Sequence, residues 1–370
     1  MKAKAGWFLA LALLLTLGGA GYVAERHAEA SRQLVVAVNR HDAPQVGALL
    51  GQGADPNVRD WETYYFDDGV FSKPSWYEKY LARLTRRKPH PTNRYVGPTM
   101  LIIAAHDGDN AVVQELLDYG ADQTLRGTEI AGGNTLLEIA PVTPLWTAIG
   151  AHHTATALLL IERGAPVNSR FDHGITPLLE MYQETTRQPP IIAALLNHGA
   201  DANAADNDGG TALQEAASCA EPATARLLLN KGANIEARNC FGTTPLMFAC
   251  TSADSLNPVL PMLLTSGADV NARDRYGRTA LINTAEDRNA AAMALLLSHG
   301  ATVDAQSNQG RTALMWVSYA RSYEAGSRWK TKRAILRALL LQHGANPHIK
   351  DKQGRTAADY EREDNPDASP

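Results

Sequence analysis

Three histidines that could ligate a metal ion occupy equivalent places in the sequence, because His198, His299 and His343 each precede a glycine. Neutral imidazole is a common metal ligand, so this set is the first candidate for metal chemistry. Equivalent places in a repeated sequence lie about one repeat apart, however, and each histidine ends an apolar helical stretch, where a cation is favoured. We therefore expect these side chains to cap helices, and we expect no metal site and no cofactor.

The other reactive side chains form no catalytic set. Cys219, Cys240 and Cys250 are too few for a disulfide framework and lack metal-site spacing, although a pairing of Cys219 with Cys250 stays open. The sequence has no Gly-rich phosphate loop, no Gly-x-Ser-x-Gly and no His-Glu-x-x-His. We expect a protein that is not an enzyme.

Aromatic and basic residues, the types best suited to binding, are concentrated between residues 61 and 96. Trp76, Tyr77 and Tyr80 fall on one helical stripe, with Arg83 beside it. Such residues dominate the energetics of protein interfaces, which makes these four candidates for partner binding. Two other interpretations are open. The stripe could pack on the neighbouring fold, or the basic segment 74–88 could touch a membrane surface.

A second basic and aromatic stretch covers residues 319–333 and includes Tyr323, Trp329 and Arg333. A similar composition suits single-stranded nucleic acid. The net charge of −4 gives the chain no general attraction to polyanions. We expect no nucleic-acid partner.

A sequence repeat must position these stretches. The segment Gly267 to Leu281, GADVNARDRYGRTAL, joins a Gly-Ala pair to Gly-x-Thr-x-Leu. Its threonine recurs from Thr143 to Thr312 at spacings of 33 or 35 residues, which indicates stacked supersecondary units. In each unit the threonine is placed to cap a first helix, a Leu-rich second helix supplies the core, and glycine ends it.

These motifs resemble the ankyrin repeat. GTTPLMFAC, from Gly242 to Cys250, matches the start of the family pattern, and ARLLLNKGANIEARN, from Ala225 to Asn239, matches the rest. The resemblance covers about residues 32–360 and implies an all-α repeat solenoid of stacked helix-turn-helix units with β-turn fingers. The family histidine after Thr-Pro-Leu is replaced, for example by Gln214 and Met247, which implies stacking through apolar contact.

The predicted organisation has four parts. Residues 1–24 form a signal anchor or signal peptide, 25–31 a linker, 32–360 the solenoid and 361–370 an acidic tail. The solenoid has about eight to nine units. Breaks in the repeat spacing place insertions at 61–96, 127–141 and 319–333.

The N-terminus predicts a location. Lys2 and Lys4 precede an uncharged run from Ala5 to Ala24, long enough for a signal peptide or a membrane span. The lysines favour an N-terminus that stays inside. We expect a bacterial single-pass protein of the inner membrane with its repeats outside; the alternative is a periplasmic protein after signal cleavage.

Ankyrin arrays generally bind proteins, so the resemblance implies a monomeric protein–protein interaction module with a protein partner. The alternative is an inhibitor or immunity-type protein that neutralises one enzyme or toxin, with the 61–96 insertion plugging its site. The expected contacts include the four insertion residues already named. The others are Trp146 on an inner helix and the fingertip residues Phe171, Phe241, Arg273, Arg275 and Tyr276.

Overall fold

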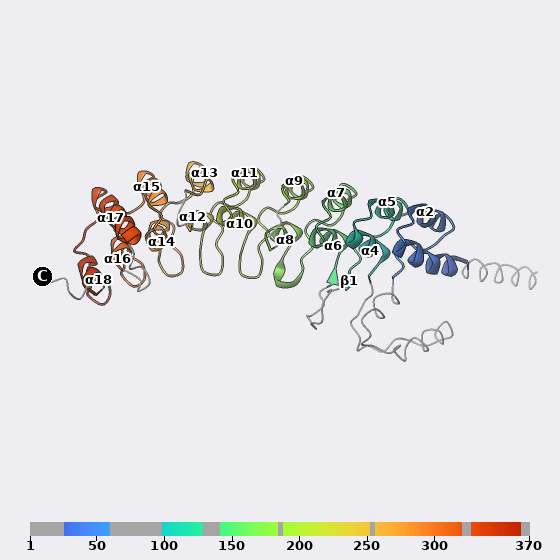
Figure 1. Cartoon of the computed structure of the whole chain (residues 1–370), viewed down its shortest axis with the longest axis horizontal. Helices are drawn as coiled ribbons and strands as arrows, with labels where there is room; N and C mark the ends of the chain where they lie inside the picture. Colours follow the sequence, from blue (N-terminus) through green and yellow to red (C-terminus); the bar gives the residue numbers. More distant parts are fainter. Residues whose placement is uncertain are drawn as a thin grey trace, which may run out of the picture. The chain divides into compact units, whose positions relative to one another are not determined.

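The structure, a computed structural model, describes residues 26–59, 98–128, 141–183, 188–251, 256–319 and 327–363. The chain forms two compact units that divide between Asp172 and His173, and a short 3-10 turn, η2 (Asp172–Gly174), spans the division. Both units consist of paired short helices joined by loops, as the ankyrin resemblance predicts (Figure 1).

The first unit begins with a helix over residues 26–39. Its first helices pack on one another in one row and its second helices in another, as the contacts of α4 with α6 and of α5 with α2 and α7 show. The bounds are α2 (Ala43–Gly51), α4 (Met100–Asp107), α5 (Asn110–Asp118), β1 (Gly127–Thr128), β2 (Pro141–Val142), α6 (Pro144–Gly150) and α7 (Thr154–Glu162).

The second unit repeats the same two-row arrangement. Figure 1 shows α8, α10, α12 and α14 in one row and α9, α11, α13 and α15 in the row above. The bounds are α8 (Pro177–Gln183), α9 (Pro189–Asn197), α10 (Ala212–Ser218), α11 (Pro222–Asn230), α12 (Pro245–Ala249), α13 (Val259–Thr265), α14 (Ala280–Asp287), α15 (Ala290–Ser298), α16 (Ala313–Ser318), α17 (Ser327–Gln342) and α18 (Ala357–Glu363).

Threonine begins the first helix of most repeats. The hydroxyl of Thr279, for instance, accepts a hydrogen bond from the Ile282 amide at 3.4 Å, and the Thr312 hydroxyl accepts from Met315 at 3.4 Å. Each bond satisfies an amide that has no partner within its helix. The core between the rows is apolar: Leu228, Leu263 and Leu296 are fully buried. Burial of one such side chain contributes about 1.5–3 kcal/mol.

Two of the predicted insertions leave and rejoin the fold through paired backbone. Arg59 and Thr99, on either side of the first insertion, form an isolated antiparallel bridge. The two-residue strands β1 and β2 lie at the two ends of the second insertion and pair in antiparallel register, with Gly127 opposite Val142. This short ladder is a local feature of the all-α repeat fold that was predicted. At the third insertion, residues 327–333 form the first part of α17. The residues inside these insertions at 60–97, 129–140 and 320–326 lie outside the described ranges.

The predicted location is wrong. The hydrophobic leader, residues 1–24, lies outside the described ranges, and no helix of the described part is long and apolar enough to cross a membrane. Even α17, with 16 residues, is shorter than the roughly 20 apolar residues that a span requires, and it carries Lys332, Arg333 and Arg337. Neither the inner-membrane placement nor its periplasmic alternative is supported.

Candidate protein-binding surface

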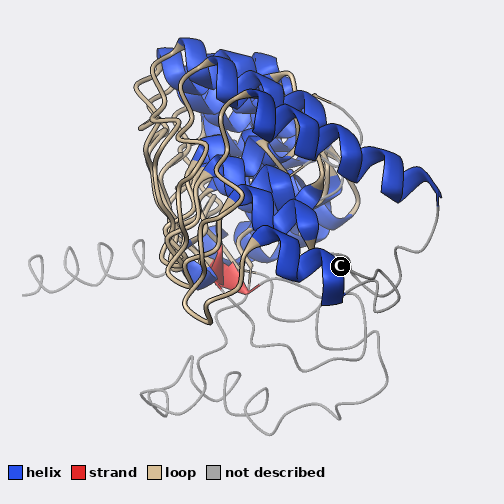
Figure 2. Cartoon of the chain, turned by 90° about the vertical axis from the view of Figure 1, so that its left-hand side faces the viewer, coloured by secondary structure: helices blue, strands red, loops and turns tan. Residues whose placement is uncertain are grey.

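The loops between repeats of the second unit form a hydrogen-bonded row. We call these loops fingers, at residues 200–211, 233–244, 268–279, 301–312 and 345–356, and Figure 2 shows such loops gathered on one side of the helices. One amide near each fingertip donates to a carbonyl of the preceding loop. The pairs are Asn207 to His173 at 2.7 Å, Cys240 to Asp208 at 2.6 Å, Arg275 to Phe241 at 2.9 Å, Asn308 to Tyr276 at 2.8 Å and Lys352 to Gln309 at 3.0 Å.

A short polar side chain folds each fingertip. In one finger Asp274 Oδ1 accepts from the amides of Tyr276 and Arg278, both at 2.8 Å. Gly277 completes this turn with a φ of 71°, and a Cβ there would lie 2.8 Å from the Asn308 amide nitrogen in the next finger. Glycine is therefore required both by the left-handed backbone and by the close approach. The fingertips are held in place before any partner binds.

Three of the predicted contacts meet on this row. Phe241 and Tyr276 are 47% and 48% exposed, well above the usual value for large aromatic side chains. The guanidinium carbon of Arg275 lies 5.9 Å from the centroid of each ring, and that of Arg278 lies 5.1 Å from Tyr276. We call Phe241, Arg275, Tyr276 and Arg278 the finger stripe. Its cation–π contacts hold large side chains in place at the surface.

Arg273 has a structural role as well as an exposed position. Its guanidinium donates to the carbonyl of Gln306 in the next finger, and its own carbonyl accepts from Arg238 at 2.7 Å. In the first unit Arg59 donates to the Arg126 carbonyl at 3.0 Å, so the same position links neighbouring repeats there too. Replacing Arg273 would therefore disturb the row of fingers as well as any partner contact.

The predicted contacts of the first unit pack on each other. Trp146 on α6 and Phe171 are half-buried, and their ring centroids lie 3.9 Å apart at an interplanar angle of 36°. The guanidinium carbon of Arg126 lies 5.5 Å from the Phe171 centroid. The insertion residues Trp76, Tyr77, Tyr80 and Arg83, and the whole segment 74–88, lie outside the described ranges.

The histidines cap helices, as their repeat positions predict. Each Nδ1 lies 2.9 Å from the carbonyl oxygen four residues earlier, on Ala194 for His198, Leu295 for His299 and Leu339 for His343. Within the described ranges no group of three or more His, Cys, Asp or Glu side chains could hold a metal ion. None of the three cysteines forms a disulfide, and burial, assisted by the charge of Asp287, raises the pKa of Cys250.

Polar stacking persists at one repeat where apolar contact was predicted. Gln214 occupies the place of the family histidine, and its Nε2 donates to the carbonyls of Ala237 at 3.0 Å and Thr243 at 2.9 Å. Its Oε1 accepts from the Thr211 amide at 2.9 Å. The predicted apolar replacement holds at Met247, which is buried. An amide can make these bonds because, like imidazole, it offers both donors and acceptors.

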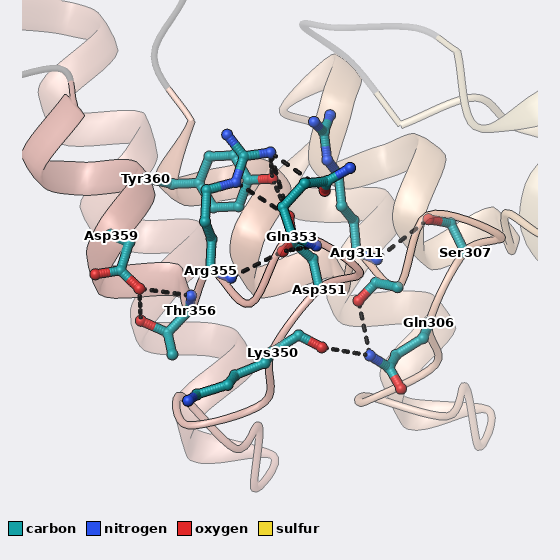
Figure 3. A network of polar contacts seen from close by, with 11 residues as sticks. Gln306, Ser307, Arg311, Lys350, Asp351, Gln353, Arg355, Thr356, Asp359 and Tyr360 are labelled. Atoms are coloured by element: carbon teal, nitrogen blue, oxygen red, sulfur yellow. Dashed lines mark hydrogen bonds and ion pairs between the residues drawn. The ribbon is translucent and has the colours of Figure 1, made fainter.

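A polar network at the last finger was not predicted (Figure 3). Asp351 accepts the amides of Gln353 at 2.9 Å and Arg355 at 2.8 Å on Oδ1, and the Tyr360 hydroxyl at 2.6 Å on Oδ2. Arg355 Nη2 lies 3.3 Å from the same Oδ2 and donates to the Tyr360 oxygen at 2.7 Å. A Gly-Arg-Thr motif that recurs at Arg278, Arg311 and Arg355 was the available sequence signal.

The pKa values of Asp351 and Tyr360 are both shifted in this network. Burial acts to raise the pKa of Asp351, but hydrogen bonds from Tyr360 and two amides, together with the Arg355 charge, outweigh it and lower the pKa. Burial raises the pKa of Tyr360, and the hydrogen bond to Asp351 raises it further. Both shifts favour the pair that is observed, an ionised carboxylate and a neutral phenol.

The repeat geometry defines a class of protein, the ankyrin-repeat proteins. A family model described as ankyrin repeats (3 copies) matches residues 183–274 and 253–351. The chain therefore carries ankyrin repeats, and the described first unit has the same paired helices and threonine caps.

Three similar proteins extend this comparison. The chain is 34% identical over 157 residues to the mouse (Mus musculus) B-cell lymphoma 3 protein homolog, covering 41% of this chain and 32% of that protein. It is 36% identical over 140 residues to Protein PhlB of Serratia liquefaciens, covering 37% and 57%. It is 31% identical over 175 residues to mouse NF-kappa-B inhibitor delta, covering 46% of each. The matched region thus spans from about a third to little more than half of each relative.

Proposed function

We propose that this protein is a non-enzymatic, monomeric protein-binding module, and that the finger stripe is its principal contact surface. The observation that carries this proposal is the set of exposed aromatic rings, Phe241 and Tyr276, held by Arg275 on hydrogen-bonded fingers. Tyrosine and arginine are over-represented among the residues that dominate interface energies. Fixed fingertips also lose little conformational entropy on binding.

Crosslinking in intact cells, followed by mass spectrometry, would identify the partner of the wild-type chain. We then expect the double variant F241A/Y276A to lose that protein. The matched control is Tyr119→Ala in the first unit, because Tyr119 is 47% exposed, almost as much as Tyr276. Retention of the partner by F241A/Y276A, or equal loss in the control, would contradict the proposal.

The choice of substitutions matters at this surface. Charge reversal of Arg273 would remove its hydrogen bond to the Gln306 carbonyl and so weaken the contact between two fingers. The Arg275 guanidinium donates to the Cys240 carbonyl at 3.4 Å, and the other contacts of this side chain are with the Phe241 and Tyr276 rings. Arg275→Glu is therefore the cleaner test of whether charge in the finger stripe contributes to binding.

A second candidate function is an inhibitor that neutralises one enzyme or toxin. One of the similar proteins is named an inhibitor, mouse NF-kappa-B inhibitor delta. In this alternative the first insertion, residues 61–96, plugs the active site of the target. The four aromatic and basic residues predicted there, Trp76, Tyr77, Tyr80 and Arg83, would be its contacts.

Deletion of the first insertion separates the two functions. The flanking residues Arg59 and Thr99 already form an antiparallel bridge, so a two-glycine connection can close the deletion without pulling the flanks apart. A general binding module retains its crosslinked partner after the deletion. If the protein is an inhibitor, the deletion variant no longer binds its target. In a titration with the wild-type chain, the activity of the target is then fully lost at one equivalent. If the deletion variant keeps its crosslinked partner and the wild-type chain does not inhibit that partner, the inhibitor function is excluded.

A further inference from the structure

Three successive repeats of the second unit contain Gly-Arg-Thr, and in two of them the arginine is neutralised within its own finger. Arg278 Nε lies 2.9 Å from Asp274 Oδ2, and its Nη1 lies 3.3 Å from Glu286. Arg355 Nη2 lies 3.3 Å from Asp351 Oδ2. In both cases the aspartate precedes the arginine by four residues, and its side chain is at most 1% exposed.

The middle repeat departs from this pattern. Ser307 stands where the other two repeats have aspartate, and its hydroxyl accepts the Arg311 amide at 3.3 Å but supplies no charge. The buried Nε of Arg311 has no hydrogen-bond partner, and no ion pair of this side chain is recorded among the described residues. Figure 3 shows the Arg311 guanidinium extending past the Asp351–Arg355 contacts without a dashed line.

Aromatic rings hold this guanidinium in place. Its central carbon lies 5.4 Å from the ring centroid of Trp316 and 5.4 Å from that of Tyr360. The Trp316 Nε1 atom is also buried, and it too has no hydrogen-bond partner in the part of the chain that the structure describes. A buried donor without an acceptor costs about 1–3 kcal/mol, so two of them on adjacent side chains indicate that an acceptor is missing.

Arg311 and Trp316 line a surface hollow of about 330 Å³, together with Tyr276 and Arg278 of the finger stripe and Ser307 to Gln309 of the next finger. The nearby carboxylates of Asp274, Glu286 and Asp351 are already paired with Arg278 or Arg355. Among the described residues, the hollow therefore combines one positive charge that no carboxylate pairs with, unused N–H donors and aromatic walls. Anionic oxygens are the complementary group, since guanidinium binds them in a forked geometry.

We propose that this hollow binds an acidic side chain, aspartate or glutamate, of an extended segment of the protein partner. Arg311 supplies the charge, the Trp316 N–H is a further donor, and the aromatic rings contact the backbone or apolar atoms beside the carboxylate. The inference rests on the proposed protein-binding function and names the chemistry of the partner segment. A phosphorylated side chain of the partner shares this chemistry, so the test includes it as a separate probe.

The test begins with a displayed library of random 12-residue peptides, panned on the purified full-length chain. We expect the recovered peptides to be enriched in Asp or Glu. The affinity of the strongest peptide, measured by fluorescence anisotropy, is expected to fall about tenfold or more when its acidic residue becomes Gln. The same peptide with phosphoserine at that position then reports which anionic source the hollow prefers. No acidic enrichment, or an affinity unchanged by Gln, overturns the proposal.

Two protein variants place the effect in the hollow. Arg311→Gln removes the charge, and Ser307→Asp supplies the internal partner that Asp274 and Asp351 give to the neighbouring arginines. Both are expected to weaken the peptide about tenfold, and S307D does so while leaving every ring and donor in place. The control is Arg226→Gln, because Arg226 is an exposed arginine on α11. Equal affinity in wild type and S307D overturns the proposal.

Two further outcomes are decisive. If F241A/Y276A loses the crosslinked partner but S307D keeps it, the hollow is excluded and the finger stripe stands. If acidic peptides bind only after residues 364–370 are removed, the hollow belongs to the chain's own acidic end, and the assignment to a partner is overturned.

Discussion

The bond between Tyr360 and Asp351 offers the sharpest test of the stability argument. The Tyr360 hydroxyl donates to Asp351 Oδ2 at 2.6 Å, and the two residues are 1% and 6% exposed. Tyr360→Phe removes the donor and leaves the ring in place. Asp351→Asn removes the charge, while its Oδ1 can still accept the amides of Gln353 and Arg355.

The expected magnitude follows from burial. A hydrogen bond to a charged group contributes about 1.5–3 kcal/mol net, and water is excluded from this one. The contact of Arg355 with the same carboxylate is longer and part-exposed, so it contributes less to stability than the Tyr360 hydrogen bond. We expect Y360F to lower the free energy of opening of the last repeat by about 2 kcal/mol and D351N by about 2–3 kcal/mol. Because both remove the same bond, the double variant should lose about 1.5–2 kcal/mol less than the sum.

Hydrogen exchange of the full chain, read by mass spectrometry on peptides covering α18, measures this quantity. Among the described helices α18 packs on α16, so its repeat can open locally, and a global unfolding curve would mix this opening with that of other repeats. Protection of α11, which lies several repeats away, is the internal control. Additivity of the two single effects within about 0.5 kcal/mol would refute the shared bond.

Three other predictions concern the same unit. The urea midpoint of the chain should fall below about pH 4 and above about pH 10. The lowered pKa of Asp351 gives stability that is lost as pH falls through the folded value, and the raised pKa of Tyr360 gives stability that is lost as pH rises through it. Y360F should abolish the alkaline loss and also reduce the acid loss, because the Tyr360 hydroxyl is one of the donors that lower the pKa of Asp351. In chemical denaturation Gly277→Ala should cost about 1–3 kcal/mol more than Gly232→Ala, because the added Cβ would overlap the next finger. Both glycines have positive φ, but an added Cβ meets nothing within 4 Å at Gly232, so an equal cost would rule out the close approach of the fingers. Gln214→Met should cost about 2–3 kcal/mol in the same assay, because two carbonyls lose their donor; a neutral result would mean that apolar stacking suffices.

Much of the fold could be predicted because its signals are local. Thr279 caps the helix that begins at the next residue, and the Nδ1 atom of His299 lies near a carbonyl only four residues earlier. Gly232 ends its helix for the same kind of reason, a left-handed backbone at one position. Such interactions need no knowledge of the neighbouring repeat, so a periodic sequence determines them. The cellular location could not be predicted from such local interactions, and no described helix is long and apolar enough to cross a membrane.

The amino-acid sequence by itself determined that this chain carries ankyrin repeats and where each repeat begins and ends. It also showed which fingertip residues do not belong to the repeated motif. Only the tertiary structure decided what those residues do. Arg273 supports the next finger, Arg275 connects two exposed rings, and Arg311 lies beside Tyr360, which comes 49 residues later. The physical reason is that these contacts run between repeats. The partner of each side chain is set by how neighbouring repeats stack, and Ser307 in place of aspartate leaves the Arg311 guanidinium without a counter-ion among the described residues.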